Sequence, residues 1–315
     1  MAHFLMFPIN ENGLILDDKV ADELVKLSAA PFDFDEYFVY SHGWWTDATR
    51  AMAEYNRFSV DFAAVVRAAA PASSLATGDA LGMGIHWPSM LSEDSGNITN
   101  YLEALSFYTM EKRADAIGEH GGFTLLQNLF QKLTNRQAPF RVNLIGHSFG
   151  CKVVCSTLQE VATEGVAMPA SAQINVVLLQ GAFDNNALDA NECYEDVLKA
   201  FPGIRFLITK STKDTALQKA YPDAHKLANL FRNVTPAMGA GGPSAAFQGS
   251  FGGSVAALQV DKNFTANLVP KDKRLVVADL SPLHQHDGYK RDPFTGSHSD
   301  IFQPEIYQLL YGFLF

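Results

Sequence analysis

The segment Gly146-His147-Ser148-Phe149-Gly150 follows the apolar run Val142-Asn143-Leu144-Ile145 and precedes a helix-compatible stretch from Lys152 to Val161. This order is typical of a strand, a sharp turn and a helix. A serine hydroxyl is a weak nucleophile unless a backbone bend holds its Oγ beside a base, and small residues two positions away on either side permit that bend. The segment therefore predicts Ser148 as a nucleophile. Because G-x-S-x-G also occurs by chance, the surrounding sequence has to support the prediction.

The composition is that of a globular protein with an extensive apolar core. Of the 315 residues, 47% are hydrophobic and 18% are charged, and α/β proteins of this length commonly form one domain, so we expect a single domain over residues 1–315. No uncharged apolar run reaches the 18 residues that a membrane-spanning helix needs. The first ten residues lack the basic and apolar regions of a signal peptide, so a cytoplasmic location is expected, although a secreted mature form fits equally well.

The charge and the cysteines exclude several classes of partner. A net charge of −10 disfavours nucleic acid and anionic membranes by long-range repulsion. Cys151, Cys155 and Cys193 contain no C-x-x-C pair, so they indicate neither a zinc motif nor a disulfide framework. Cys151 and Cys155 are one helical turn apart behind the turn at Ser148, which favours buried packing over a redox or metal role.

Apolar runs rich in branched and aromatic residues alternate with helical segments along most of the chain. This alternation predicts an α/β fold with a mostly parallel central sheet of about eight strands and helices on both faces. An initial hairpin, Phe4–Phe7 with Leu14–Leu16, is expected around the turn cluster Asn10-Glu11-Asn12-Gly13. Further strands are expected at 37–40, 81–86, 142–145, 174–179, 204–209 and 275–278, and helices at 19–29, 48–70, 122–134, 152–164, 191–200 and 305–313.

Two long connections stand apart from this alternation. Residues 89–120 contain an acidic, serine-rich segment followed by an aromatic helix-like stretch, and residues 221–264 include a run rich in Gly, Ala and Ser from Met238 to Val255. The Gly-rich run predicts a mobile loop. Either connection could cover a site.

In its order of landmarks, the sequence resembles the α/β-hydrolase fold family, over most of residues 36–315. Besides the turn at Ser148, it has His42-Gly43-Trp44-Trp45 directly after the strand at 37–40. The resemblance implies that backbone N–H groups here and at Phe149 form an oxyanion hole, with Trp44 as the first choice and Gly43 as a neighbouring candidate. Such donors stabilise the negative charge of a tetrahedral intermediate. The alternative is that His42-Gly43 is a simple turn and the tryptophans belong to the core.

The resemblance also implies a triad acid beyond the second strand after the nucleophile. Asp214 follows the strand at 204–209 after a few turn residues, and Asp184 follows the preceding strand, a position that some family members use. An aspartate there would orient the histidine and stabilise its protonated form. Asp214 is the first choice. A solvated loop aspartate or a helix N-cap is the alternative for either residue.

The histidine of the triad should follow the last strand, at 275–278. His284, His286 and His298 are the candidates, and His298 lies in the turn-rich segment Gly296-Ser297-His298-Ser299-Asp300 just before the C-terminal helix, as the family pattern requires. The order Ser148, Asp214, His298 then agrees with the family order of serine, acid and histidine. His284-Gln285-His286-Asp287 could suggest a metal cluster, but spacing of two residues in an irregular loop is unspecific, and no metal site is predicted.

The sequence departs from the family where many members carry a large cap. Only about twenty residues separate the strand ending at Leu179 from the next strand, too few for such a cap. Any cover must come from residues 89–120 or 221–264. The candidates for lining the substrate pocket are His42, Trp45, Trp87 and His147, although core packing is the commoner role of such tryptophans.

The resemblance implies a serine hydrolase that cleaves carboxylic esters through an acyl-enzyme, without a metal or organic cofactor. The expected partner is a small-molecule ester, with neither nucleic acid nor integral membrane association. An acyltransferase or a peptidase-like enzyme with the same triad, or a catalytically silent relative that binds a ligand, remains an alternative. Apolar residues around Ser148 suggest short to medium acyl groups.

Overall fold

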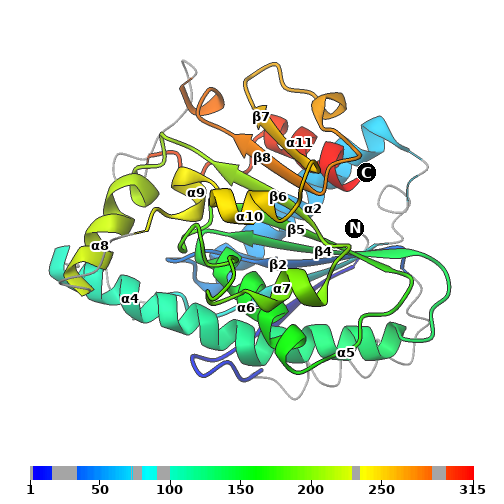
Figure 1. The fold of residues 1–315 in the computed structure, drawn as a ribbon, viewed down its shortest axis with the longest axis horizontal. Coiled ribbons are helices and arrows are strands. Elements are labelled where there is room, and N and C mark those ends of the chain that lie inside the picture. Colours follow the sequence, from blue (N-terminus) through cyan, green and yellow to red (C-terminus); the bar gives the residue numbers. More distant parts are fainter. Residues whose placement is uncertain are drawn as a thin grey trace.

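The computed structural model describes residues 3–15, 34–71, 73, 80–90, 100–228, 235–285 and 296–315. Within these ranges, eight strands form one sheet in the order β1-β3-β2-β4-β5-β6-β8-β7, and every neighbouring pair is parallel (Figure 1). The strands are β1 His3–Pro8, β2 Glu36–Ser41, β3 Ala80–His86, β4 Phe140–His147, β5 Ala172–Leu179, β6 Arg205–Lys210, β7 Val255–Gln259 and β8 Leu275–Asp279. The predicted parallel α/β architecture is confirmed.

Helices cover both faces of the sheet. The first face packs against α4, α5 and α6, and the second packs against α2 and α11 (Figure 1). The described helices are α2 Ala48–Ala69, α4 Asn100–Ile117, α5 Phe123–Leu133, α6 Phe149–Thr163, α7 Asp196–Ala200, α8 Tyr221–Ala228, α9 Met238–Gly241, α10 Ala245–Gly249 and α11 Pro304–Leu314, with π-helical turns η1 Gly118–Gly122 and η2 Ala216–Ala220 and 3-10 turns η3 Ala266–Leu268 and η4 Leu283–Gln285. None of the helices in these ranges is both long and apolar enough to cross a bilayer.

The central strands are buried on both sides, as parallel sheets require. In β4, Val142 and Leu144 belong to the core on the α6 face, whereas Ile145 belongs to the core on the α2 face. Such strands read as continuous apolar runs instead of alternating ones, which is why the sequence located them. The helix α2 begins where Asp47 accepts a hydrogen bond from the Arg50 N–H at 2.8 Å, an ordinary N-cap.

The N-terminal segment differs from the predicted hairpin. The turn forms, since the Asn10 side chain accepts hydrogen bonds from the N–H groups of Asn12 and Leu14, both at 2.9 Å. Among the described residues, the two arms of this turn meet in an antiparallel bridge between Ile9 and Ile15, while β1 itself pairs in parallel with β3. The turn of the predicted hairpin is thus present, whereas Leu16, the last residue of its second strand, lies outside the described residues. The helix predicted at 19–29 lies outside the described residues.

The Gly-rich run from Met238 to Val255 is also different from its prediction. Instead of an irregular loop, it contains α9, α10 and the first residue of β7, a strand that the sequence did not suggest. The rings of Phe247 and Phe251 pack edge-on against Phe206 of β6, with centroids 5.4 and 6.1 Å away. Tertiary packing thus orders a segment whose composition alone is typical of a loop.

The connection between β5 and β6 agrees with the prediction that no large cap fits there. Residues 180–204, all of which are described, contain only the five-residue helix α7, which is shorter than the helix predicted at 191–200. Asn191 has a positive φ of 66°, which does not belong to a helix. Ser148, Asp214 and His298 follow the carboxyl ends of β4, β6 and β8, and the parallel sheet brings these ends to one edge.

Candidate active site

Ser148 lies at the sharp turn between β4 and α6. Its φ of 56° and ψ of −123° are strained for a residue with a side chain, and 4% of it is exposed. The turn is held by its own backbone: the Ser148 N–H donates to the Leu179 carbonyl at 3.0 Å, and the Ser148 carbonyl accepts from the N–H groups of Cys151 and Ala182, both at 3.1 Å. Positive φ in a serine indicates a functional turn when the surroundings enforce it, as they do here.

The two glycines of the pentapeptide are required by close backbone approach. A Cβ on Gly146 would lie 2.5 Å from the Cys151 N atom, and a Cβ on Gly150 would overlap the carbonyl oxygen of Ser41. A methyl group on Gly146 would therefore force β4 and α6 apart, and one on Gly150 would force α6 away from the end of β2. This is the physical reason for small residues two positions before and after Ser148.

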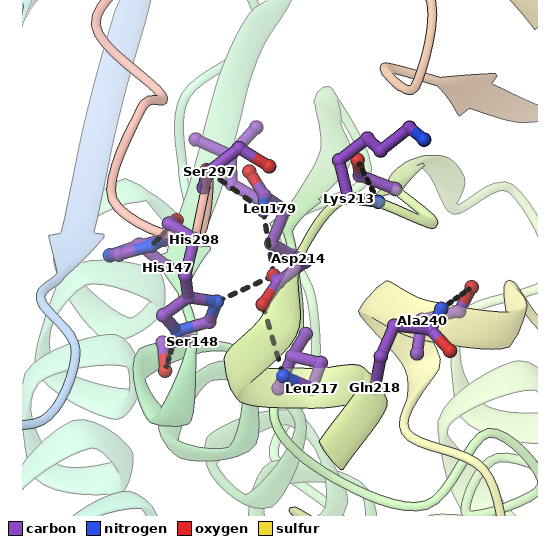
Figure 2. A network of polar contacts seen from close by, with 12 residues as sticks. His147, Ser148, Leu179, Lys213, Asp214, Leu217, Gln218, Ala240, Ser297 and His298 are labelled. Atoms are coloured by element: carbon purple, nitrogen blue, oxygen red, sulfur yellow. Dashed lines mark hydrogen bonds and ion pairs between the residues drawn. The ribbon is translucent and has the colours of Figure 1, made fainter. Parts of the chain in front are cut away.

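His298 connects Ser148 with Asp214. Its Nε2 is 2.8 Å from the Ser148 Oγ, and its Nδ1 is 2.6 Å from the Asp214 Oδ2 (Figure 2). A carboxylate only accepts hydrogen bonds, so Nδ1 carries the proton and Nε2 is the atom free to accept from the serine hydroxyl. The structure brings together the three residues that the sequence named as a triad.

Asp214 is completely buried, and three groups of the described residues donate to its carboxylate. Besides His298 Nδ1, the Oδ2 atom accepts from Gln180 Nε2 at 2.7 Å, and Oδ1 accepts from the Leu217 N–H at 3.0 Å. The Oδ1 atom thus caps the helical segment that follows. Asp214 therefore acts as a helix N-cap, the alternative named from the sequence, and also contacts His298. Three hydrogen bonds compensate the burial of an ionised carboxylate.

The alternative acid, Asp184, is occupied elsewhere. Its Oδ1 accepts from the Tyr221 hydroxyl at 2.8 Å, and its backbone forms a bridge with Ala237. The structure therefore brings Asp214, and not Asp184, to His298.

The other histidine candidates do not join this constellation. His284 is fully buried, and its Nδ1 lies 2.9 Å from the Ser211 Oγ. His286 and Asp287 lie outside the described residues. In the part of the chain that the structure describes, no three His, Cys, Asp or Glu side chains form a group suited to a metal ion.

The loop after β2 lies against the nucleophile. A Cβ on Gly43 would be 2.9 Å from the Ser148 Cβ, so only glycine allows this approach. His42 Nδ1 lies 2.8 Å from the Gly43 carbonyl oxygen, and in a trans peptide the Trp44 N–H points opposite to that carbonyl. The N–H of Trp45 donates to the Ser89 carbonyl at 3.2 Å, which anchors the far side of the loop.

Among the described residues, the backbone N–H groups of Gly43, Trp44 and Phe149 have no hydrogen-bond partner. These are the residues that the sequence named as candidate oxyanion donors, with Trp44 and Phe149 as the first choice. Phe149 is the first residue of α6, where an N–H has no acceptor within the helix and the helix dipole favours negative charge.

His42 and Trp87, two of the candidates for the substrate pocket, lie in the interior. Both are completely buried, and their rings stack at a centroid distance of 5.5 Å and an interplanar angle of 4°. His42 Nε2 accepts from the Trp87 N–H at 3.3 Å, while burial lowers the pKa of His42 to about 3. Their placement corrects the assignment of both residues to the pocket, because neither side chain is exposed. They pack beneath the loop that follows β2, where a neutral histidine ring can be buried at small cost.

Aromatic rings from both long connections meet over Phe149. The Phe107 ring on α4 lies 4.9 Å from the Phe149 ring and 5.4 Å from the Tyr221 ring at the start of α8. Trp44 packs on Phe107 at 5.9 Å, and Trp45, of which 42% is exposed, stands edge-on to Trp44 at 5.7 Å. Of the two tryptophans proposed for the pocket, Trp45 is therefore the one that solvent reaches.

The cysteines behind Ser148 agree with the packing interpretation. Cys151 and Cys155 are buried and free, and burial raises the pKa of both thiols, so neither is a reactive thiolate. Cys193 is exposed.

Gln180 and Ser89 are the neighbours of the site that the sequence did not suggest. Gln180 follows β5 directly, and its Nε2 donates to the Ser297 carbonyl at 3.3 Å as well as to Asp214. A polar residue at the carboxyl end of a strand next to the nucleophile strand was the available signal.

A parallel sheet with a strained serine turn, an adjoining histidine and a buried aspartate in this chain order defines the α/β hydrolases. A family model described as "Alpha/beta hydrolase of unknown function (DUF900)" matches residues 55–230, more than half of the chain, and the protein belongs to that family. The matched range includes Ser148 and Asp214 but neither His298 nor the loop at Gly43. Among curated proteins, none matches the chain.

Proposed function

We propose that this protein is a serine hydrolase that cleaves carboxylic esters through a Ser148-His298-Asp214 triad and an acyl-enzyme. The observation that carries the proposal is the pair of short contacts at His298, 2.8 Å from Nε2 to the Ser148 Oγ and 2.6 Å from Nδ1 to the Asp214 Oδ2. Both distances are within the range expected for a general base that is oriented by a carboxylate.

In the first half of the proposed reaction, His298 Nε2 takes the hydroxyl proton as Ser148 Oγ attacks the ester carbonyl. The protonated ring then gives that proton to the leaving alcohol as the C–O bond breaks. Asp214 stays ionised and stabilises the imidazolium. In the second half, water replaces the alcohol, His298 takes one of its protons, and the acid leaves as Ser148 Oγ regains a proton.

The N–H groups of Trp44 and Phe149 are the proposed oxyanion hole, with Gly43 supplying the close approach. Both groups lack a partner in the described residues and flank Ser148. Removing one such donor typically lowers kcat by about 100- to 1,000-fold, so donors that are already in position contribute strongly to rate.

We further propose that residues 1–315 form one domain, since the triad is assembled from the ends of β4, β6 and β8 of a single sheet.

The connections at 89–120 and 221–264 are the proposed cover of the site, supported by the contact of Phe107 with Tyr221 above Phe149. Trp45 is the proposed aromatic wall for a short to medium acyl group.

The proposal is tested with a fluorophosphonate probe and a series of p-nitrophenyl esters of increasing acyl length. The wild-type protein should become labelled at Ser148, as located by mass spectrometry of the digested protein, and should release p-nitrophenol in a burst. Ser148→Ala should abolish both. Ser156→Ala is the matched control, because Ser156 is also buried on α6 but donates to the Asp115 carbonyl at 2.9 Å and should keep wild-type activity.

Unchanged turnover in Ser148→Ala would contradict the proposal. A labelled protein that transfers its acyl group to an added alcohol faster than to water would identify an acyltransferase with the same triad. Absence of labelling in the folded wild-type protein would indicate a catalytically silent relative.

A further inference from the structure

His147, the residue before the nucleophile, contacts the backbone of His298. Its Nε2 lies 2.9 Å from the His298 carbonyl oxygen (Figure 2). Because a carbonyl oxygen only accepts, Nε2 must carry the proton and donate. His298 is thus bonded at two points to adjacent residues of the same turn, at its side chain by Ser148 and at its own peptide by His147.

The other contacts of the His298 loop hold different residues. Gly296 forms a bridge with Asp214, the Ser297 N–H donates to the Lys213 carbonyl at 3.5 Å, and the Ser297 carbonyl accepts from Gln180 at 3.3 Å. These contacts attach residues 296 and 297 to the side of the site where Asp214 lies. Among the described residues, His147 alone bonds the peptide of His298 to the turn that carries the nucleophile.

The surroundings of His147 favour a neutral ring in one orientation. The ring is buried between the His298 ring, 5.1 Å away between centroids, and Gly43, where a Cβ would lie 3.2 Å from Nδ1. Burial, together with the nearby His298, lowers the pKa of His147 to about 3. His147 therefore stays neutral when His298 accepts a proton, and no like-charge repulsion opposes that step.

We propose that His147 is a positioning residue for the triad, whose Nε2–H holds the backbone of His298 so that the imidazole stays within reach of Ser148 and Asp214. This inference rests on the proposed function. It assigns to His147 an action through His298, not contact with the substrate, and so replaces its earlier assignment to the substrate pocket. Displacement of a catalytic group by about 1 Å can lower the rate roughly 100-fold, so a single backbone contact can matter this much.

Three substitutions separate the hydrogen bond from the filling of space. His147→Phe keeps a ring but removes the donor, His147→Gln places an amide nitrogen close to the position of Nε2, and His147→Asn carries an amide too short to reach the His298 carbonyl. We expect kcat for a p-nitrophenyl ester to fall roughly 10- to 100-fold in His147→Phe and His147→Asn, with KM within about twofold of wild type. His147→Gln should keep most of kcat.

A spectroscopic measurement supports the kinetics. The strongly deshielded proton between His298 Nδ1 and Asp214 Oδ2 should be visible by proton NMR in the wild-type protein and in His147→Gln, and should weaken or shift in His147→Asn. Circular dichroism and thermal unfolding check that each variant is folded. If His147→Phe does not fold, the comparison of kcat between His147→Gln and His147→Asn tests the positioning role.

The outcomes distinguish the inference from the function on which it rests. If wild-type protein is labelled at Ser148 and hydrolyses the ester, but the Gln and Asn variants have equal kcat, His147 has no positioning role although the triad is correct. A rise in KM at constant kcat would likewise overturn the inference, since it would indicate substrate contact. If the wild-type protein itself shows neither labelling nor turnover, the proposed function fails first.

Discussion

Gln180 donates from Nε2 to the Oδ2 of Asp214 at 2.7 Å, and this is the same carboxylate oxygen that accepts from His298 Nδ1 at 2.6 Å. Gln180 is completely buried and has a positive φ of 47°, and its own Oε1 has no hydrogen-bond partner among the described residues. Strain and an unsatisfied carbonyl both cost stability, so the residue is unfavourable for the fold alone. The amide group of Gln180 fixes the orientation of the Asp214 carboxylate, so that its Oδ2 atom faces His298.

Replacing Gln180 should therefore affect turnover more than substrate binding. Gln180→Met keeps the length of the side chain and removes the donor, and since a hydrogen bond to a charged group contributes about 1.5–3 kcal/mol, we expect kcat to fall roughly tenfold or more. Gln180→Glu should be worse, because a second carboxylate would face Asp214. Steady-state kinetics on the p-nitrophenyl esters measure both. Equal kcat in wild type and Gln180→Met would show that the donors from His298 and Leu217 suffice.

The choice between the two candidate acids can be tested directly. Asp214→Asn should lower kcat by about 10,000-fold, because an amide in place of the carboxylate favours the wrong histidine tautomer and no longer stabilises the imidazolium. Asp184→Asn is the matched control: its partner is the Tyr221 hydroxyl, so it should alter stability slightly and leave kcat near wild type. The reverse result, a large loss in Asp184→Asn alone, would show that Asp214 is not the acid.

The turn at Ser148 sets a steric limit that mutation can measure. A Cβ on Gly150 would overlap the Ser41 carbonyl oxygen, so Gly150→Ala must move α6 away from β2. We expect a loss of about 1–3 kcal/mol in the free energy of unfolding, the usual cost of overpacking, together with a loss of esterase activity. Urea unfolding and the p-nitrophenyl ester assay provide the two measurements.

Gly249→Ala is the control for that experiment. Gly249 ends α10, and a Cβ there would meet no atom within 4 Å. Alanine in a helical position is favoured over glycine by up to about 1 kcal/mol, so this variant should be as stable as wild type or slightly more stable. A loss of stability as large as that of Gly150→Ala would mean that the steric account of the turn is wrong.

The sequence located the strands that carry the site because each is a short apolar run that ends in turn residues. Ser148, Asp214 and His298 follow β4, β6 and β8, and parallel strands bring their carboxyl ends to one edge of the sheet, so their meeting could be predicted. The helices α9 and α10 could not be predicted, because this Gly- and Ala-rich segment has no apolar periodicity. The packing of Phe247 on Phe206, far away in the sequence, orders the segment.

The polar contacts around the triad could not be predicted from the sequence, for a different reason. His147 and Gln180 act at single atoms of residues 151 and 34 positions away, and no local pattern encodes such a contact. For the same reason, the sequence predicts pocket positions for His42 and Trp87, whereas in the structure both are buried, joined by a hydrogen bond and by stacked rings.

Two buried histidines should make the fold sensitive to acid. The pKa of His42 and that of His147 are each lowered to about 3, chiefly by burial, whereas a histidine in the unfolded chain titrates near 6.5. Between these values the unfolded state binds a proton that the folded state does not, so each histidine lowers the free energy of unfolding as the pH falls from about 6.5. Partial burial raises the pKa of Glu54 to about 7, which acts in the opposite direction between about 4.5 and 7.

A comparison of wild type with His147→Gln isolates one of these histidines, because His42 and Glu54 are the same in both proteins. As the pH falls from about 6 to 4, the wild-type protein should lose about 1.4 kcal/mol more per pH unit than His147→Gln. Urea unfolding at pH 7.5, 6, 5 and 4 measures the difference, with His120→Gln, a substitution of an exposed histidine, expected to follow the wild-type slope. Parallel pH dependence in wild type and His147→Gln would mean that His147 is protonated in the folded protein, which its buried position beside His298 argues against.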